Sequence, residues 1–187
     1  MDNRQKHNAQ VSTDKYFNSK VEYAYALKQQ RKFFKKVRSI IVKDGKVLVI
    51  KVTYKNGDKD HYLLPGGGVD EGETVKQAAA RESLEEYGVI VKPTKYLGNQ
   101  YYSCNMNRNG EIFKSNRVEY YYLCEYQSTK ENSDFGVGNE FKSDEKTYEK
   151  TALSLSDLEK IDHNSLNNIK KSVFNNLISY LKEKTPV

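Results

Sequence analysis

The first half of the chain shows the pattern of apolar residues that is typical of β-strands. β-Branched residues are frequent at positions 37–42 and 47–54. Asp44 and Gly45 lie between these stretches and predict a two-residue hairpin turn. A further turn signal precedes a short apolar stretch at 61–64. We therefore expect three consecutive strands in this region.

Apolar residues at helical spacing predict four helices. The stretches concerned are 14–34, 74–87 and a short one at 156–161. Ser165 is expected to cap the fourth helix, which has a single apolar stripe. The stripe consists of Leu166, Ile169, Val173, Leu177 and Leu181. We interpret it as core packing rather than as a surface that binds a partner.

The remaining strands are expected in the second half of the chain. They are predicted at 89–91, 96–103, 112–114 and 118–126. Residues 127–146 are polar and rich in turn-forming residues, so they predict a long loop, and loops of this length within compact domains are often functional.

The bulk properties indicate a protein without a membrane segment. The 187 residues suit one domain with a hydrophobic core and some extra segments. No apolar run approaches the ~20 residues of a membrane helix, and the polar stretch Met1–Gln10 predicts no secretory signal. Cys104 and Cys124 are too few for a disulfide framework. Free thiols and a cytoplasmic location are therefore expected.

The chain is basic, with a formal net charge of +6 from 31 basic and 25 acidic residues. This balance suits a phosphate-bearing substrate. Aromatic residues interrupt the basic cluster at 31–38, a composition that can also bind single-stranded nucleic acid. A solvated, lysine-rich surface explains the charge more simply. Nucleic acid is therefore a secondary candidate partner behind a small nucleotide.

A glycine-rich turn at 64–73 leads directly into the helix predicted at 74–87. Thr74 can cap that helix, and Gln77 stands where it completes a capping box. Gly88 follows at the position of a left-handed C-terminal cap. The helix residues expected to face the core are Ala80, Leu84 and Tyr87.

Three glutamates of this helix predict a metal site. Glu82, Glu85 and Glu86 lie on one narrow arc and repel each other by a few tenths of a kcal/mol per pair, roughly. A divalent cation would offset this repulsion, and magnesium prefers oxygen ligands. The adjacent glycine turn would let a diphosphate approach closely. A merely solvated acidic face would not explain the spacing of Glu73 and Arg81.

These residues resemble the sequence box of the Nudix hydrolase family. The box reads Gly, five residues, Glu, seven residues, then Arg-Glu-apolar-any-Glu-Glu-any-Gly-apolar. The matching residues here are Gly67, Glu73, Arg81, Glu82, Glu85, Glu86, Gly88 and Val89. The one departure is Ser83, which stands at an apolar position of the box. The expected strand order extends the resemblance from about Val37 to the C-terminus.

The resemblance implies an α/β fold, an α/β/α sandwich around a mixed β-sheet. Residues 36–187 would form the Nudix hydrolase domain and residues 1–35 a partly helical extension. The implied activity is Mg²⁺-dependent cleavage of a diphosphate linkage in a nucleoside diphosphate derivative, with Mn²⁺ as a substitute metal. Nucleoside triphosphates, ADP-ribose, nucleotide sugars and RNA 5′ ends are the candidate substrates. The N-terminal segment is expected to pack on the domain or on a second subunit, which makes a homodimer a candidate assembly.

The resemblance also implies roles for individual residues. Glu82, Glu85 and Glu86 would bind metal together with the backbone carbonyl of Gly66. Arg81 would pair with Glu73 and hold the geometry of loop and helix.

The general base has several candidates, since relatives use either a box glutamate or an acid from a later loop. Glu82 and Glu86 are the candidates within the box. Residues 136–141 resemble a Gly-x-Gly-x-Glu-Phe segment of some relatives, which makes Glu140 the candidate outside it, with Glu145 in reserve. Arg38 and Lys51, on early strands, are candidates for contact with substrate phosphate.

The alternative function is a catalytically silent Nudix module that senses a nucleotide or binds RNA. Such modules usually have eroded box glutamates, and all three are intact here.

Overall fold

The computed structural model describes residues 15–17, 33–108, 111–130 and 145–184. The chain forms two compact units. The smaller one comprises Met1–Lys35 and Gln100–Glu119, and the larger one Lys36–Asn99 and Tyr120–Val187. In the described residues, no helix has the length and apolar content that crossing a membrane requires.

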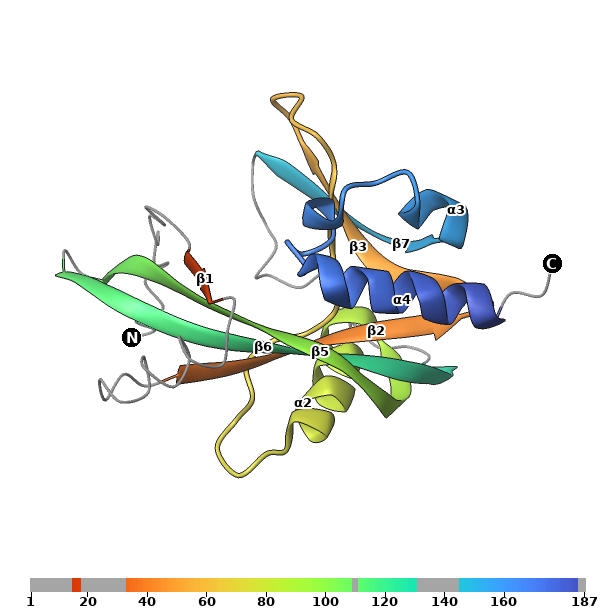
Figure 1. The fold of residues 1–187 in the computed structure, drawn as a ribbon, viewed down its shortest axis with the longest axis horizontal. Coiled ribbons are helices and arrows are strands. Elements are labelled where there is room, and N and C mark those ends of the chain that lie inside the picture. The colour runs from red at the N-terminus through yellow and green to blue at the C-terminus, as the bar shows by residue number, and fades with distance from the viewer. Residues whose placement is uncertain (1–14, 18–32, 109–110, 131–144, 185–187) are drawn as a thin grey trace. The chain divides into compact units, whose positions relative to one another are not determined.

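The sheet has seven strands (Figure 1). They are β1 (Lys15–Phe17), β2 (Phe33–Lys43), β3 (Lys46–Tyr54), β4 (His61–Leu63), β5 (Val89–Arg108), β6 (Glu111–Thr129) and β7 (Lys146–Leu153). In the larger unit the order is β5-β6-β2-β3-β4, and β7 also pairs with β3. In the smaller unit β1 pairs antiparallel with β5. The helical elements are α2 (Val75–Glu82), the π-helical turn η1 (Ser83–Tyr87), α3 (Leu155–Leu158), the 3-10 turn η3 (His163–Ser165) and α4 (Lys171–Lys184).

Strand β3 organises the larger unit because it pairs with three other strands. A tight turn joins it to β2, where Asp44 and Gly45 take positive φ angles of 49° and 71°. This confirms the predicted hairpin. Further along, β3 pairs with β4 from Ile50 to Val52. Along its opposite edge β3 pairs with β7 over eight residues, from Val47 to Tyr54.

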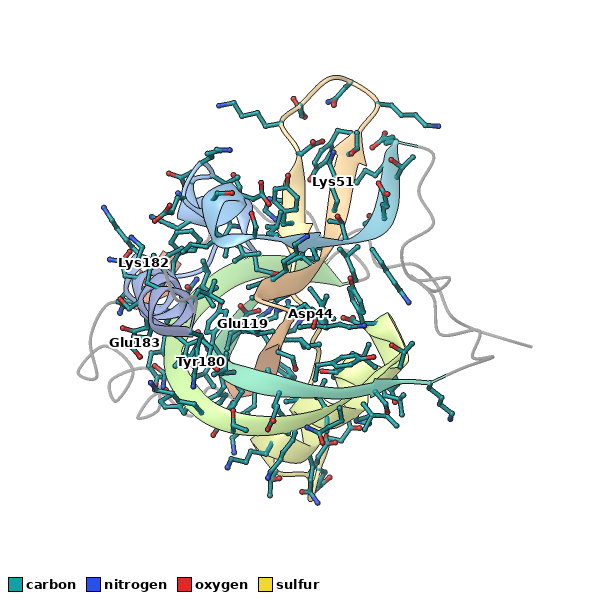
Figure 2. All side chains as sticks on the ribbon, turned by 90° about the vertical axis from the view of Figure 1, so that its right-hand side faces the viewer. Asp44, Lys51, Glu119, Tyr180, Lys182 and Glu183 are labelled. Carbon is teal, nitrogen blue, oxygen red and sulfur yellow. The ribbon has the colours of Figure 1, made fainter. Side chains whose placement is uncertain are left out.

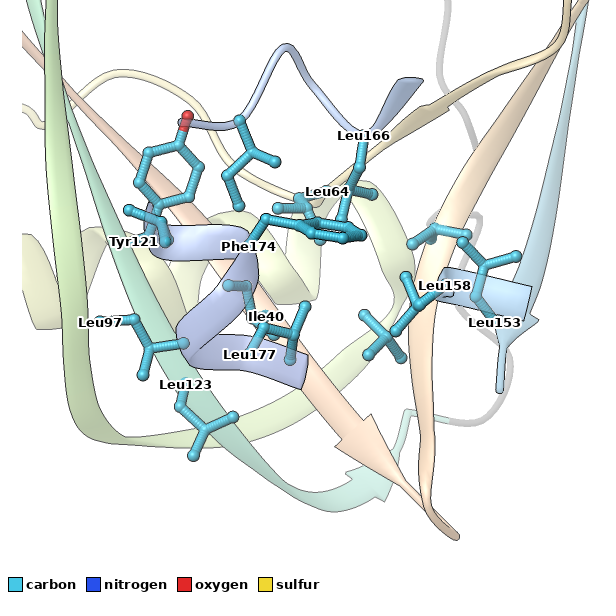
Figure 3. Packing of buried hydrophobic residues seen from close by; sticks show 14 of the residues in the cluster. Ile40, Leu64, Leu97, Tyr121, Leu123, Leu153, Leu158, Leu166, Phe174 and Leu177 are labelled. Atoms are coloured by element: carbon cyan, nitrogen blue, oxygen red, sulfur yellow. The ribbon is translucent and has the colours of Figure 1, made fainter. Parts of the chain in front are cut away.

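Consecutive residues of the strands pack into two separate cores, as the pleat of a sheet requires. Ile40 packs in the core that includes the apolar face of α4 (Figure 3), whereas Ile41 packs in the core that includes Ala78 and Ala79 of α2. Helices therefore cover both faces of the mixed sheet in the larger unit. The α/β/α sandwich expected from the sequence is confirmed.

The helix expected at 14–34 is wrong at both of its ends. Lys15–Phe17 is a strand, and β2 already begins at Phe33; residues 18–32 lie outside the described residues. The helix expected from Ser165 is also wrong, because Asn167 and Asn168 have positive φ angles and α4 begins only at Lys171. The apolar stripe is nevertheless core, since all five of its residues are buried.

Several strands extend beyond the predicted ranges. The stretches predicted as separate strands at 89–91 and 96–103 belong to the single strand β5, and those at 112–114 and 118–126 belong to β6. Strand β7 was not predicted at all. Cys124 is a buried free thiol, and burial raises its pKa to about 12. The side chain of Cys104 lies outside the described residues.

Candidate active site

The glycine-rich turn runs beside β2 instead of projecting into solvent. The backbone N–H of Val37 donates to the carbonyl of Gly67 at 3.0 Å, and the N–H of Ser39 donates to the carbonyl of Pro65 at 2.7 Å. These bonds continue the sheet past the end of β4. The turn is thereby fixed to a core strand before the helix begins.

Two glycines of the turn are required by its surroundings. Gly66 has a φ of 151°, and a Cβ there would lie 2.0 Å from the carbonyl oxygen of Val37. A Cβ on Gly67 would lie 2.4 Å from a carboxylate oxygen of Glu82. The first glycine lets the turn approach β2, and the second makes room for a glutamate of the helix.

The helix after the turn begins and ends as predicted. Thr74 accepts a hydrogen bond from the N–H of Gln77, and the Gln77 side chain accepts one from the N–H of Thr74 at 2.9 Å. Gly88 ends the helical segment in the left-handed conformation, and its N–H donates to the carbonyl of Leu84. Between these caps the segment changes from α-helix to the π-helical turn η1, which was not predicted.

Arg81 connects this helix to the glycine-rich turn. Its Nε donates to one carboxylate oxygen of Glu73 at 3.0 Å, and one terminal nitrogen donates to the other at 2.9 Å. The same terminal nitrogen donates to the carbonyl of Gly68 at 2.9 Å. This two-pronged pair lowers the pKa of Glu73. The geometry expected for Arg81 and Glu73 is present.

Arg81 also faces the glutamate ridge of Glu82, Glu85 and Glu86. Its second terminal nitrogen donates to Glu82 at 2.9 Å and to Glu85 at 3.0 Å. Asp70 adds a fourth carboxylate, 3.6 Å from the guanidinium. One positive charge therefore contacts four negative ones, and the site as a whole favours a further cation.

The three glutamates of the ridge differ in environment. Glu82 is buried, and burial raises its pKa although Arg81 acts in the opposite direction. The side chain of Glu85 is about half exposed. Glu86 reaches back to the turn and accepts a hydrogen bond from the N–H of Gly66 at 2.8 Å. Hence the ridge and the turn are joined at Glu86 as well as at Arg81.

The donor set fits a divalent metal ion. Carboxylates with a backbone carbonyl are the oxygen ligands that Mg²⁺ and Mn²⁺ take. A guanidinium nitrogen already lies between Glu82 and Glu85, which shows that a positive group fits there. Among the described residues, no three acidic, histidine or cysteine side chains converge as a ready-made ligand set.

Arg38 lies at this site. From β2 its guanidinium donates to the carbonyl of Gly66 at 2.7 Å, the carbonyl that the sequence indicated as a metal ligand. Its charge also acts on Glu82. Arg38 thus lies beside the turn and the ridge, and its contact with a substrate phosphate stays a prediction.

Lys51 is placed elsewhere. It lies on β3 near the loop to β4, at the opposite end of Figure 2 from α2, and pairs with Asp60 at 2.8 Å. The structure does not bring it to the ridge. Glu140 lies outside the described residues, and Glu145 is exposed, with its backbone carbonyl accepting a hydrogen bond from Lys55.

Three side-chain contacts around the helix were not predicted from the sequence. Ser39 and Ser83 are fully buried and both donate to the carbonyl of Ala79, at 3.0 and 2.6 Å. Lys150 donates to the carbonyl of Tyr87 at 2.9 Å. A serine at an apolar position of the box was the one signal available, and the lysine gave none.

Comparison with known proteins shows the family of this chain. The family model for the NUDIX domain matches residues 34–170. A Nudix hydrolase structure from Nitrosomonas europaea has a TM-score of 0.55 at 20% identity, over 82% of this chain and 91% of that one. The chain belongs to the Nudix family.

Two curated relatives match over shorter stretches. The ADP-ribose pyrophosphatase of Methanocaldococcus jannaschii is 48% identical over 62 residues, which is 33% of this chain and 36% of that protein. An RxLR effector protein of Phytophthora infestans is 47% identical over 45 residues, 24% of this chain and 17% of the effector. The match thus spans well under half of either relative.

Proposed function

We propose that this chain is a Mg²⁺-dependent Nudix pyrophosphohydrolase that cleaves the diphosphate linkage of a nucleoside diphosphate derivative. The observation that carries the proposal is the contact of Arg81 with Glu73, Glu82 and Glu85. Through it, one guanidinium joins an intact ridge of carboxylates to the glycine-rich turn. In a helix with a purely structural role, so concentrated a negative charge would only be destabilising.

The residues have separate roles in this proposal. Glu82, Glu85 and Glu86 would hold the metal ion with the carbonyl of Gly66. A bound ion would neutralise charge on the diphosphate and make water more acidic. Arg81 keeps turn and ridge in register through Glu73, as the described contacts support.

Arg38 is the candidate for contact with the substrate. Its guanidinium lies at the Gly66 carbonyl, so it would donate to a phosphate oxygen of a substrate that approaches the metal ligands. Contact of Lys51 with a substrate phosphate stays a prediction, because Lys51 forms its ion pair with Asp60 and not at this site.

The general base would be a glutamate, and Glu82 and Glu86 are the candidates within the box. Glu140 remains the competing candidate from the loop.

ADP-ribose heads the substrate candidates. The Methanocaldococcus jannaschii relative is named an ADP-ribose pyrophosphatase, and its identity of 48% is high over the matched stretch. Nucleoside triphosphates, nucleotide sugars and 5′-triphosphorylated RNA complete the set.

The test is a substrate panel with Mg²⁺, read as phosphate released after phosphatase coupling. Wild type, Glu82→Gln and Glu71→Gln are compared; Glu71 is an exposed acid of the same turn. Glu82→Gln should reduce turnover at least ~10²-fold, the typical contribution of a general base, while Glu71→Gln keeps the wild-type rate. Turnover should vanish in excess chelator and return with Mg²⁺ or Mn²⁺.

Two results would contradict the proposal. Unchanged turnover in excess chelator would exclude a metal-dependent reaction. A folded wild type that binds nucleotides or RNA but turns over no panel substrate would favour the silent module, and strong salt dependence of RNA binding would identify the RNA-binding form.

A further inference from the structure

The end of the catalytic helix is held by strand β7. Lys150 donates from its ammonium group to the backbone carbonyl of Tyr87 at 2.9 Å. The hydroxyl of Tyr87 in turn donates to the backbone carbonyl of Thr151 at 2.8 Å. Two neighbouring residues of β7 therefore fix both the backbone and the side chain of the last residue of η1.

Tyr87 and Lys150 are both partly buried, so their hydrogen bond is more shielded from solvent than one at the surface. Burial raises the pKa of Tyr87 to about 12 and lowers the pKa of Lys150. The ammonium group also lies 5.3 Å from the centre of the Tyr87 ring. The last carbonyls of a helix lack partners within the helix, and a cation there is favourable. The lysine satisfies one of them.

Strand β7 is a firm support for this contact. Lys150 pairs with Ile50, and Thr151 pairs with Val49, in the central strand β3. Ile50 and Val49 are both fully buried. A movement of η1 relative to β7 would therefore be a movement relative to the core of the larger unit.

The start of η1 is fixed as well. The hydroxyls of Ser39 and Ser83 both donate to the carbonyl of Ala79 in the last turn of α2. A π-helical turn disturbs the regular hydrogen-bond ladder, and such turns occur frequently at functional sites. Two buried serines bond the Ala79 carbonyl, which also accepts from the backbone N–H of Ser83, at one end, and β7 holds the other end.

The residues between these two fixed ends are the metal-binding candidates Glu85 and Glu86. Glu86 directly precedes Tyr87 and reaches the N–H of Gly66. A shift of the backbone at Tyr87 changes the direction of both carboxylates. Residues that orient metal ligands without binding the metal typically change metal affinity or activity by about 10–100-fold when they are replaced.

We propose that Lys150 and Tyr87 are positioning residues, which fix η1 against β7 and thereby direct Glu85 and Glu86 toward the metal ion. The proposal rests on the proposed function, because it takes the glutamate ridge as the metal site. Neither residue touches the substrate. Their effect is expected first on metal affinity and only through it on turnover.

The experiment measures Mn²⁺ binding to the full chain without substrate, by the loss of the free-ion signal in electron paramagnetic resonance. Lys150→Met should weaken Mn²⁺ binding about 10-fold, whereas Lys150→Arg keeps a donor and should stay within about 2-fold of wild type. The matched control is Lys146→Met. Lys146 lies on the same strand and faces the ring of Tyr54 at 4.9 Å, so its loss should leave Mn²⁺ binding unchanged.

Tyr87→Phe provides a second, milder variant that removes only the hydroxyl contact with Thr151. It should weaken Mn²⁺ binding less than Lys150→Met does, with a melting temperature close to wild type. If Lys150→Met does not fold, Tyr87→Phe and Lys150→Arg decide the matter. Wild-type Mn²⁺ affinity in a folded Lys150→Met, or in Tyr87→Phe when Lys150→Met does not fold, overturns the proposal.

The two proposals fail in different ways. A chain that binds Mn²⁺ but hydrolyses no panel substrate lacks the proposed function, yet Lys150→Met still tests the positioning role. A wild type without Mn²⁺ binding overturns the positioning role, because no ion is then held by Glu85 and Glu86. Hydrolysis is decided separately by the substrate panel.

Discussion

Three consecutive glycines of the turn should respond differently to the same substitution. Gly66, Gly67 and Gly68 are adjacent, but a Cβ would meet the backbone of β2 at the first, the Glu82 carboxylate at the second and nothing within 4 Å at the third. Replacing each by alanine adds the same methyl group. The series therefore separates the structural from the chemical function of the turn.

The expected magnitudes follow from these contacts. Gly66→Ala places a side chain at a positive φ angle, which destabilises the fold by about 1–3 kcal/mol. The added methyl group also overlaps a backbone oxygen at 2.0 Å, which destabilises it by about 1–3 kcal/mol more. We expect a loss of at least ~2 kcal/mol, which for a chain of this size lowers the melting temperature by at least roughly 4 °C. Gly68→Ala should be neutral or stabilising by up to ~1 kcal/mol, because it restricts the unfolded chain.

Gly67→Ala should separate stability from activity. The methyl group would lie 2.4–2.7 Å from the Glu82 carboxylate, the flexible end of a side chain. The carboxylate can move away, so the melting temperature should fall by only a few degrees, about 1 kcal/mol. A displacement of about 1 Å can cost on the order of 10²-fold in rate, and we expect that loss here.

Thermal unfolding and turnover of the best panel substrate, measured on all three variants, test this reasoning. Equal melting temperatures for Gly66→Ala and Gly68→Ala would contradict the close approach of the turn to β2. A fully active Gly67→Ala would show that the position of the Glu82 carboxylate does not matter, and with it the assignment of the ridge would be wrong.

Further predictions concern Arg81, Glu140 and the N-terminal segment. Arg81→Lys should lose at least two of the five hydrogen bonds that Arg81 donates to oxygens of Glu73, Gly68 and the ridge. The free energy of unfolding should fall by ~2–3 kcal/mol, which lowers the melting temperature by roughly 4–12 °C. A decrease of less than about 2 °C would refute this. Because Arg81 holds the pKa of Glu73 below its ordinary 4.5, this stabilisation is present above pH 4.5 and is lost as pH falls through the lowered pKa, so an acid titration of stability should show a smaller loss in Arg81→Lys than in wild type. Glu140→Gln should reduce turnover at least ~10²-fold if the loop supplies the base, and only slightly if Glu82 does. Removal of residues 1–34 should lower the melting temperature or change the mass in solution, as measured by light scattering, and a truncated chain that is unchanged in both would contradict packing of this segment.

The parts of the fold that were predicted correctly depend on neighbouring residues in the sequence. The capping box of Thr74 and Gln77 is one example, since three residues of spacing suffice to define it. The turn at Asp44 and the left-handed cap at Gly88 are others. In each case the backbone conformation follows from side chains within a few positions.

The burial of the helix predicted at 74–87 was predicted only in part. Ala80 and Tyr87 are partly buried and pack against the core, as expected. The fully buried residues are Ala78, Ala79 and Ser83, with Glu82 nearly so. From Ser83 onward the segment is a π-helical turn, in which α-helical spacing no longer applies. A turn with one extra residue cannot be read from a pattern with constant spacing.

Strand β7 shows why the support of a site is harder to predict than its chemistry. Its sequence is Lys-Thr-Tyr-Glu-Lys-Thr-Ala-Leu, in which only the last residue is buried, so no apolar alternation marks it. It becomes a strand because β3 offers eight partners. The contact between Lys150 and Tyr87 spans 63 positions of the chain. The ligands of the proposed metal site lie within one short motif because their chemistry requires fixed spacing along a helix. Their orientation depends on the core, and the core is assembled from strands that are distant in sequence. The residues that hold η1 in place are therefore found from contacts, not from the motif that they support.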